Sequence, residues 1–241
     1  MNIVISQPMY FPWVGMFEQV RLCDRFVFYD DVQFSKGSFT NRVQVKSPSK
    51  EGFKWMTVPL KSLKLGERIN EVEIDDSKDW RDQHAGLLKQ SYHSAPYYDE
   101  MRHMTDLLFN ETCRTISGLS QKSMELVIDY YEMGENKEFF ISSELEIDGS
   151  STQRVFDIVR HFDGDRYITG HGAKNYLDHG LFEENGISVE YMDYQRLPYP
   201  QQHGAFNPHV SILDLIANTG KEGIKFITST TKKWREFVHE S

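Results

Sequence analysis

The second half of the chain alternates between short β-rich runs and amphipathic helical segments, and this order constrains the fold more than any other feature. EFFISSEL precedes SSTQRVFDIVRHF, in which apolar residues recur at helical spacing. RYITG, AKNYLDHGLFEENG, ISVEYMDY and SILDLIANTG then continue as strand, helix, strand and helix. We expect Ser151 or Thr152 to cap the first helix, a capping box of Ser211 and Asp214 to start the last, and Gly220 to end it. Such alternation forms βαβ units, so the sequence predicts a parallel sheet.

The first half supplies further strands and a helical segment. Residues 2–6 and 26–29 are short buried strands in this interpretation, with a helix over 14–22 between them. NRVQVK (41–46) and FKWMTVPL (53–60) form a hairpin across SPSKEG, and INEVEID (69–75) is a third alternating strand. Three helices are expected near 79–92, 97–112 and 120–133. We therefore expect one α/β domain over residues 1–241: an open, mostly parallel Rossmann-like sheet with flanking helices and a helical insertion over 78–134.

Composition narrows the classes of partner. The 27 Lys and Arg against 36 Asp and Glu give a net charge of −9, which disfavours a surface for long nucleic acid. No apolar run approaches the roughly twenty residues of a membrane-spanning helix, so we expect no transmembrane segment. Cys23 and Cys113 are far apart and no secretory leader precedes the first strand, which favours reduced thiols in a cytoplasm. The sequence is compatible with a monomer and with an oligomer.

Loops that follow parallel strands are the expected ligand-binding segments, because open α/β sheets bind ligands beyond the carboxyl ends of their strands. The rule selects residues 6–15, 30–42, 142–154 and 169–176. In the first segment, prolines stiffen a loop that presents the amide of Gln7, with Tyr10 and Trp13 able to stack on a flat ligand. Alternatively, and equally well, the Gln7 amide forms hydrogen bonds with the backbone of its own loop. Buried aromatic residues such as Tyr10 and Trp13 more often belong to the core.

Polar residues are densest after the second strand. Of Asp30 and Asp31, which are neighbours and so face opposite sides, only one can point into a cleft, where it can act as a general base or bind a cation. Lys36 and Arg42 are suited to phosphate or carboxylate. Gln33 and Asn41 complete the set. Each of these charges alone also fits an ordinary surface role.

Two later segments are weaker candidates. TGHGAKNYL (169–177) places glycines and His171 between a strand and a helix, where backbone N–H groups suit an anion, but it lacks G-x-G-x-x-G and the Walker pattern. His171 is a candidate proton-transfer group. Gln201 lines the cleft if its loop folds back over the sheet. Nine histidines form no H-E-x-x-H motif and no cluster at ligand spacing, so no metal site is predicted, and G-x-S-x-G is absent.

Several of these blocks together resemble the WbqC-like family. The resemblance rests on QPMYFPWVGMFEQV, FVFYDDVQFSKGSFTNRVQVK, WMTVPL, SSTQRVFDIV, YITGHGAKNYLD and YPQ…F.P.VSILDLI, which occur in the family's order over nearly the whole chain. The family pattern carries over to Gln7, Pro8, Tyr10, Pro12, Trp13, Gly15, Asp31, Gln33, Asn41, Arg42, Thr152, Arg154, Gly170, Gly172, Ala173, Tyr176 and Gln201. Ser6 is a departure, because the family has histidine before its Gln-Pro pair.

The resemblance implies a role in bacterial O-antigen and surface-polysaccharide synthesis. It implies an enzyme that modifies a nucleotide-linked sugar by adding an acyl or aminoacyl group to a sugar amine, with a nucleotide sugar and a small acyl-type donor as substrates. Asp31 and His171 are then the candidate bases. A looser likeness to the HIGH-superfamily nucleotidyltransferases gives an alternative that needs ATP and magnesium, although the paired histidines are absent. A non-catalytic sugar-nucleotide-binding protein is the third possibility.

Overall fold

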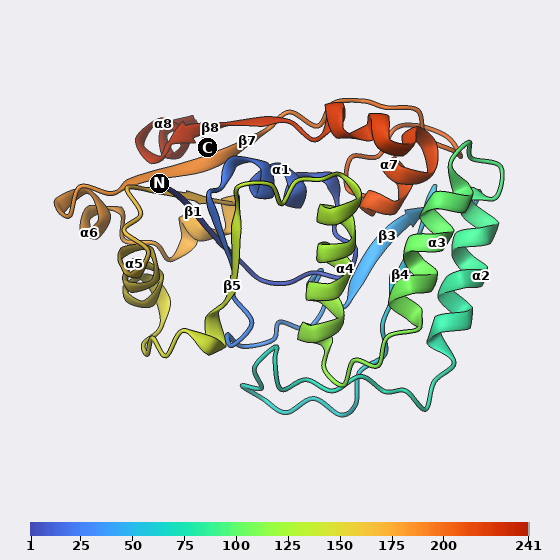
Figure 1. Cartoon of the computed structure of the whole chain (residues 1–241), viewed down its shortest axis with the longest axis horizontal. Coiled ribbons are helices and arrows are strands. Elements are labelled where there is room, and N and C mark those ends of the chain that lie inside the picture. Colours follow the sequence, from blue (N-terminus) through green and yellow to red (C-terminus); the bar gives the residue numbers. More distant parts are fainter. Residues whose placement is uncertain (241) are drawn as a thin grey trace.

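The computed structural model describes residues 1–240 and contains an open six-stranded sheet (Figure 1). The strands are β1 (Asn2–Ser6), β2 (Arg25–Phe28), β5 (Glu138–Ile141), β6 (Arg166–Thr169), β7 (Ser188–Tyr194) and β8 (Ser229–Lys233). Their spatial order is β5-β2-β1-β6-β7-β8. All neighbours pair in parallel except β7 and β8, which are antiparallel. The predicted open, mostly parallel sheet is confirmed.

Side chains of the central strands alternate between two cores, as a sheet buried on both faces requires. Val4 of β1 packs in the larger core, whereas Ile3 and Ile5 pack in the smaller one. The larger core includes α1 (Val14–Leu22) and α7 (Ile212–Thr219), and the smaller core includes α5 (Ser151–His161) and α6 (His179–Glu184).

The strand order reverses between β1 and β6. The chain leaves β1 through α1 and adds β2 on one side, and β5 extends this side further. It then crosses back through α5 to place β6 on the other side of β1. Right-handed crossovers that run to opposite sides of β1 place their helices on opposite faces of the sheet. Helices α1 and α5 therefore cover opposite faces. The gap beyond the ends of β1 and β6 is thus the topological switch point, where open α/β sheets bind ligands.

The segment between β2 and β5 forms a separate layer (Figure 1). It contains the antiparallel hairpin β3 (Arg42–Lys46) and β4 (Phe53–Thr57), followed by α2 (Trp80–Tyr92), α3 (Tyr98–Phe109) and α4 (Ile116–Tyr130). The hairpin and the three helices of the insertion are confirmed. Short 3-10 helices occur at η1 (Ser142–Glu144), η2 (His171–Asn175) and η3 (Gly220–Phe226), and α8 (Trp234–Glu240) follows β8.

Three predicted elements differ from the structure. Residues 69–75 form no strand and contribute only isolated bridges, such as that of Ile74 with Leu60. The last insertion helix begins at Ile116 because the Thr115 hydroxyl accepts a hydrogen bond from the Gly118 amide. The helix expected near 173–186 is divided into η2 and α6, since Asp178 caps a new start by accepting from the amides of the next turn.

Two of the predicted caps were also wrong. Neither Ser151 nor Thr152 caps α5, whose N-cap residue is Ser150. Ser211 does cap α7 by accepting from the Leu213 amide, but its own amide bonds to the Gln44 carbonyl, so Asp214 completes no capping box. Gly220 ends α7 at a positive φ of 55°, as predicted.

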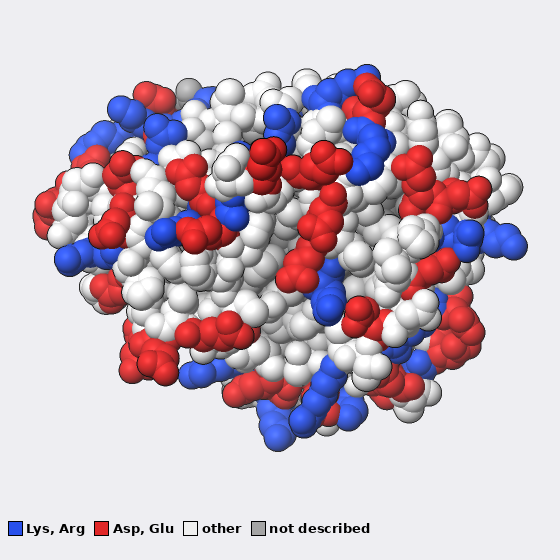
Figure 2. Space-filling view, viewed as in Figure 1, with Lys and Arg blue, Asp and Glu red and all other residues white. Residues whose placement is uncertain are grey.

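Acidic and basic side chains are interspersed on the face shown in Figure 2. None of the helices in residues 1–240 combines the length and the apolar character needed to cross a membrane.

Candidate functional site

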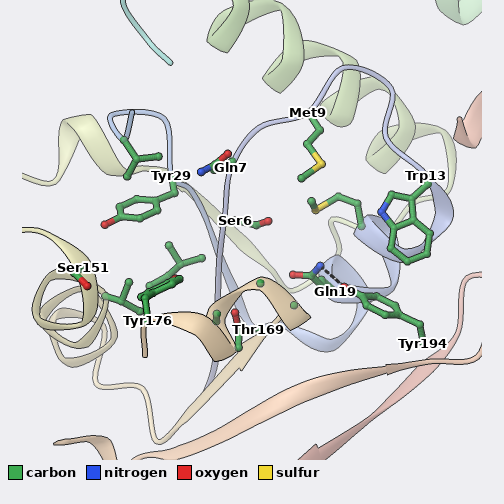
Figure 3. Close-up of a pocket in the computed structure, with 17 residues that line it drawn as sticks. Ser6, Gln7, Met9, Trp13, Gln19, Tyr29, Ser151, Thr169, Tyr176 and Tyr194 are labelled. Carbon is green, nitrogen blue, oxygen red and sulfur yellow. Dashed lines mark hydrogen bonds between the residues drawn. The ribbon is translucent and has the colours of Figure 1, made fainter. Parts of the chain in front are cut away.

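A cavity of about 530 Å³ opens at the switch point of the sheet (Figure 3). Ser6 ends β1, Tyr29 directly follows β2, Thr169 ends β6 and Tyr194 ends β7, and all four line the cavity. Its volume lies within the range typical of small-molecule sites. The strand-end rule therefore located this cavity from the sequence.

Trp13 forms one wall, and a glycine makes room for it. Its ring centre lies 4.8 Å from that of Tyr194 and 5.5 Å from that of His209. A Cβ atom at Gly15 would lie 2.2 Å from the indole, which is far inside van der Waals contact. Gly15 thus lets the indole lie against the first turn of α1.

The wall continues in a hydrogen-bonded pair. The side-chain amide of Gln19 on α1 donates to the Tyr194 hydroxyl at 2.9 Å (Figure 3). A Cβ atom at Gly170 would lie 3.3 Å from that hydroxyl, whereas one at Gly172 would meet open space. A side chain at residue 170 would therefore crowd the Tyr194 hydroxyl, which must then move by a few tenths of an ångström.

None of the seventeen residues that line the cavity carries a charged side chain. Polar groups are hydroxyls and amides, and the apolar surface is aromatic or aliphatic. From the predicted set, the structure brings together Gln7, Trp13, Gly170, Gly172 and Tyr176. The other lining residues are Ile5, Ser6, Met9, Met16, Gln19, Tyr29, Val32, Ser151, Val155, Thr169, Ala173 and Tyr194.

The two aspartates are held by internal partners. Asp30 is 3% exposed, and its carboxylate accepts hydrogen bonds from the amide and the hydroxyl of Ser143. Asp31 pairs with the Arg154 guanidinium through two contacts of 2.9 and 2.5 Å and also accepts from the Ser142 hydroxyl at 2.6 Å. Burial opposes ionisation of Asp31, but the hydrogen bonds from Arg154 and Ser142 outweigh it and lower the pKa of the carboxyl.

Arg154 connects this ion pair to the cavity wall. Its guanidinium carbon lies 5.3 Å from the ring centre of Tyr29, which lines the cavity. The pair itself does not line the cavity. The arrangement suits positioning of Tyr29 better than proton abstraction by Asp31.

His171 lies between the lining residues Gly170 and Gly172, but it is exposed and does not itself line the cavity. Its Nε2 atom is 2.7 Å from the Met192 carbonyl oxygen, and its ring packs against Tyr194 and Phe237 at 5.2 and 4.7 Å. A carbonyl only accepts, so Nε2 carries the proton and Nδ1 is an acceptor in the neutral ring. Thr152 fixes the same loop, donating to the Tyr176 carbonyl and accepting from the Asp178 amide.

The hairpin and core candidates lie outside the cavity lining. Gln33 and Lys36 are exposed. Asn41 is buried and donates to the Val58 carbonyl, while Arg42 donates to the Gly37 carbonyl and stacks on Trp55 at 4.3 Å. Tyr10 is fully buried.

Two of these placements follow from hydrogen bonds within the protein. The Tyr10 hydroxyl is 3.0 Å from Nδ1 of His84 in the core. The Gln201 amide donates to the Tyr199 hydroxyl and the Asn207 carbonyl. The loop of Gln201 folds back, but toward the hairpin and α7 rather than the cavity.

Sequence reasoning missed several lining residues. Tyr29 and Tyr194 adjoin strand ends, so the same rule that selected the loops pointed to them. Gln19 lies in the second turn of α1 and had no such signal, since its position depends on how α1 packs. In the described part of the chain, no three His, Cys, Asp or Glu side chains are placed to hold a metal ion.

Comparison with known proteins places the chain in a family. Residues 7–226 match the model of the WbqC-like protein family. The uncharacterized protein Rv1507c of Mycobacterium tuberculosis is 29% identical over 229 residues, which covers 94% of this chain and 97% of that protein. No solved structure matches significantly. The chain belongs to the WbqC-like protein family.

Proposed function

We propose that this protein is a cytoplasmic transferase that modifies a nucleotide-linked amino sugar in the synthesis of bacterial O-antigen or another surface polysaccharide. The observation that carries the proposal is an uncharged cavity of hydroxyls, amides and aromatic rings at the switch point of the sheet. Hydroxyls and amides form hydrogen bonds with sugar hydroxyls, and aromatic rings pack on flat apolar faces. Such a lining suits the sugar or the nucleoside of the substrate.

The transferred group is an acyl or aminoacyl group that a small donor supplies to the sugar amine. The amine loses a proton as the amide forms, and a positioned base contributes typically 10²–10⁴-fold to such a step. Of the two candidates, Asp31 is paired with Arg154, whereas His171 has an acceptor nitrogen in its neutral form. His171 is therefore the base in this proposal, and Asp31 supports the wall.

Nucleotidyl transfer has less support. This reaction needs a magnesium ion, which proteins hold through carboxylates, and no Asp or Glu lines the cavity. The candidate cations Lys36, Arg42 and Arg154 do not line it either. A non-catalytic sugar-nucleotide-binding protein is a second candidate, because the lining contains no charged side chain that can act as acid or base.

A ligand panel tests the proposal. UDP- and dTDP-amino sugars, and ATP with magnesium, are compared by thermal unfolding. A ligand at a hundred times its dissociation constant adds about 2.7 kcal/mol, which is about 5–10 °C for a domain of this size. We expect a nucleotide sugar to raise the melting temperature and ATP to have no effect. A response to ATP with magnesium alone, or to no member of the panel, refutes the proposal.

Variants separate binding from catalysis. Trp13→Leu removes the indole that forms one wall of the cavity. The matched control is Trp55→Leu, because Trp55 is an exposed tryptophan of the β3–β4 hairpin. We expect only the first to abolish the ligand shift. His171→Gln keeps binding but slows acyl transfer to the amine, measured by mass spectrometry, by about 10²-fold or more. Ligand binding without turnover by the wild type supports the binding-protein alternative.

A further inference from the structure

A second cavity, of about 670 Å³, lies between the turn of the β3–β4 hairpin and the loop over residues 203–207. It shares no lining residue with the strand-end cavity. Lys46, the last residue of β3, forms part of its wall. The proposed transferase activity makes no use of this site.

Lys46 is unusual because it is only 2% exposed. Its ammonium donates to the Ala205 carbonyl at 2.6 Å, which accounts for one of its three donors. Among the described residues, no carboxylate forms an ion pair with it. A buried cation without a contacting anion is costly, so an anion in the adjoining cavity would be stabilised.

One carboxylate within the protein acts on Lys46 from a distance. Asp214 on α7 is fully buried and acts on Lys46 electrostatically. Burial raises the pKa of Asp214 to about 7, although Tyr199, Tyr92 and Lys46 oppose this shift. Neither carboxylate oxygen of Asp214 has a hydrogen-bond partner among the described residues, so Asp214 does not contact the Lys46 ammonium.

The remaining charges of the cavity define the ligand. Lys50 and Glu51 are exposed and of opposite sign, so Lys46 supplies the one net positive charge of the lining that is shielded from water. One ammonium balances one unit charge and has donors left for two oxygens. We propose that this cavity binds a small carboxylic acid through its carboxylate, held by Lys46.

The test is an NMR titration of the full chain with sodium acetate, with sodium chloride and inorganic phosphate at equal ionic strength. We expect saturable amide shifts confined to residues 46–53 and 203–207 with acetate, and weaker ones with phosphate. No saturation, shifts elsewhere, or tighter binding of phosphate overturns the proposal.

Two lysine variants give the matched comparison. Lys46→Met keeps an unbranched side chain that is one atom shorter and removes the charge, so we expect a loss of acetate affinity of about tenfold or more. Lys50→Met, in the same cavity but exposed, should change it by less than about twofold. Equal affinities of the two variants contradict the proposal. If Lys46→Met does not fold, the Nζ titration of Lys46 in the wild type decides: acetate must raise its pKa, and no change refutes the site.

Discussion

The Asp31–Arg154 pair offers a direct test of whether Asp31 is structural or catalytic. Each of the two side chains is 9% exposed, and the guanidinium contacts both carboxylate oxygens. Arg154→Met removes the cation and leaves a carboxylate that is almost entirely shielded from water. Breaking a buried pair in this way costs about 3–5 kcal/mol. We expect Asp31→Asn to cost less, about 1.5–3 kcal/mol, because the amide still accepts from Ser142.

The measurement is urea unfolding at pH 7, with the double variant completing a thermodynamic cycle. The double variant should cost about 1–3 kcal/mol less than the sum of the single variants, because neither charge is then left unpaired. Arg102→Met is the control, since Arg102 bonds Asp106 at 2.8 Å with both side chains about half exposed. Exposed pairs at this helical spacing contribute about 0.3–0.5 kcal/mol.

The pH dependence has a definite sign. Asp31 has a lower pKa in the folded protein than in the unfolded chain, so its stabilising contribution is present above about pH 4 and is lost as the pH falls through the folded value. The difference between wild type and Arg154→Met should therefore shrink in acid. Additive single variants, or an Arg154→Met protein as stable as the control, would falsify the structural assignment. Loss of turnover in Asp31→Asn at unchanged stability would restore Asp31 as the base.

Three further changes test individual placements. Gly15→Ala should displace the Trp13 indole, weaken ligand binding about tenfold and alter tryptophan fluorescence, while an unchanged emission spectrum counts against the wall. Asp214 has a raised pKa of about 7, so stability should fall as pH rises from about 4 to 7, and Asp214→Asn should flatten that slope in unfolding curves. Tyr10→Phe should cost about 1–3 kcal/mol by leaving Nδ1 of His84 without its partner, yet leave ligand affinity unchanged in calorimetry.

Local periodicity was sufficient for most of the fold. Ile3, Val4 and Ile5 read as one buried strand, and they do fill two cores on opposite faces of β1. The strand-end rule then located the cavity, because parallel strands that share a sheet end at a common edge. The failures at residues 69–75 and at Thr152 arise from long-range pairing: Ile74 forms only a bridge with Leu60, and the Thr152 hydroxyl serves the Tyr176 loop.

The charged residues predicted for the site were harder to assign, because the sequence does not show which of them form ion pairs with one another in the folded protein. Arg154 lies 123 residues from Asp31, and only the packing of α5 behind β2 brings them together. The Arg42 guanidinium likewise donates to the Gly37 carbonyl and stacks on Trp55, both of which lie in the segment between β2 and β5. Arg42 and Arg154, both predicted site residues, thus bind partners within the protein, while neutral residues such as Gln19 form the lining.

Because the lining is uncharged, recognition of a ligand depends on which lining groups donate and which accept hydrogen bonds. The Gln19 amide donates to the Tyr194 oxygen, so the Tyr194 proton and the Gln19 carbonyl oxygen remain for a ligand. The pair therefore presents one donor and one acceptor side by side, next to the Trp13 ring. A ligand that lacks the matching pair leaves buried polar groups unsatisfied, which is penalised much more strongly than a missing methyl group. Selectivity among sugars or bases should accordingly depend on Gln19 and Tyr194, and little on salt concentration, because no charge lines the cavity.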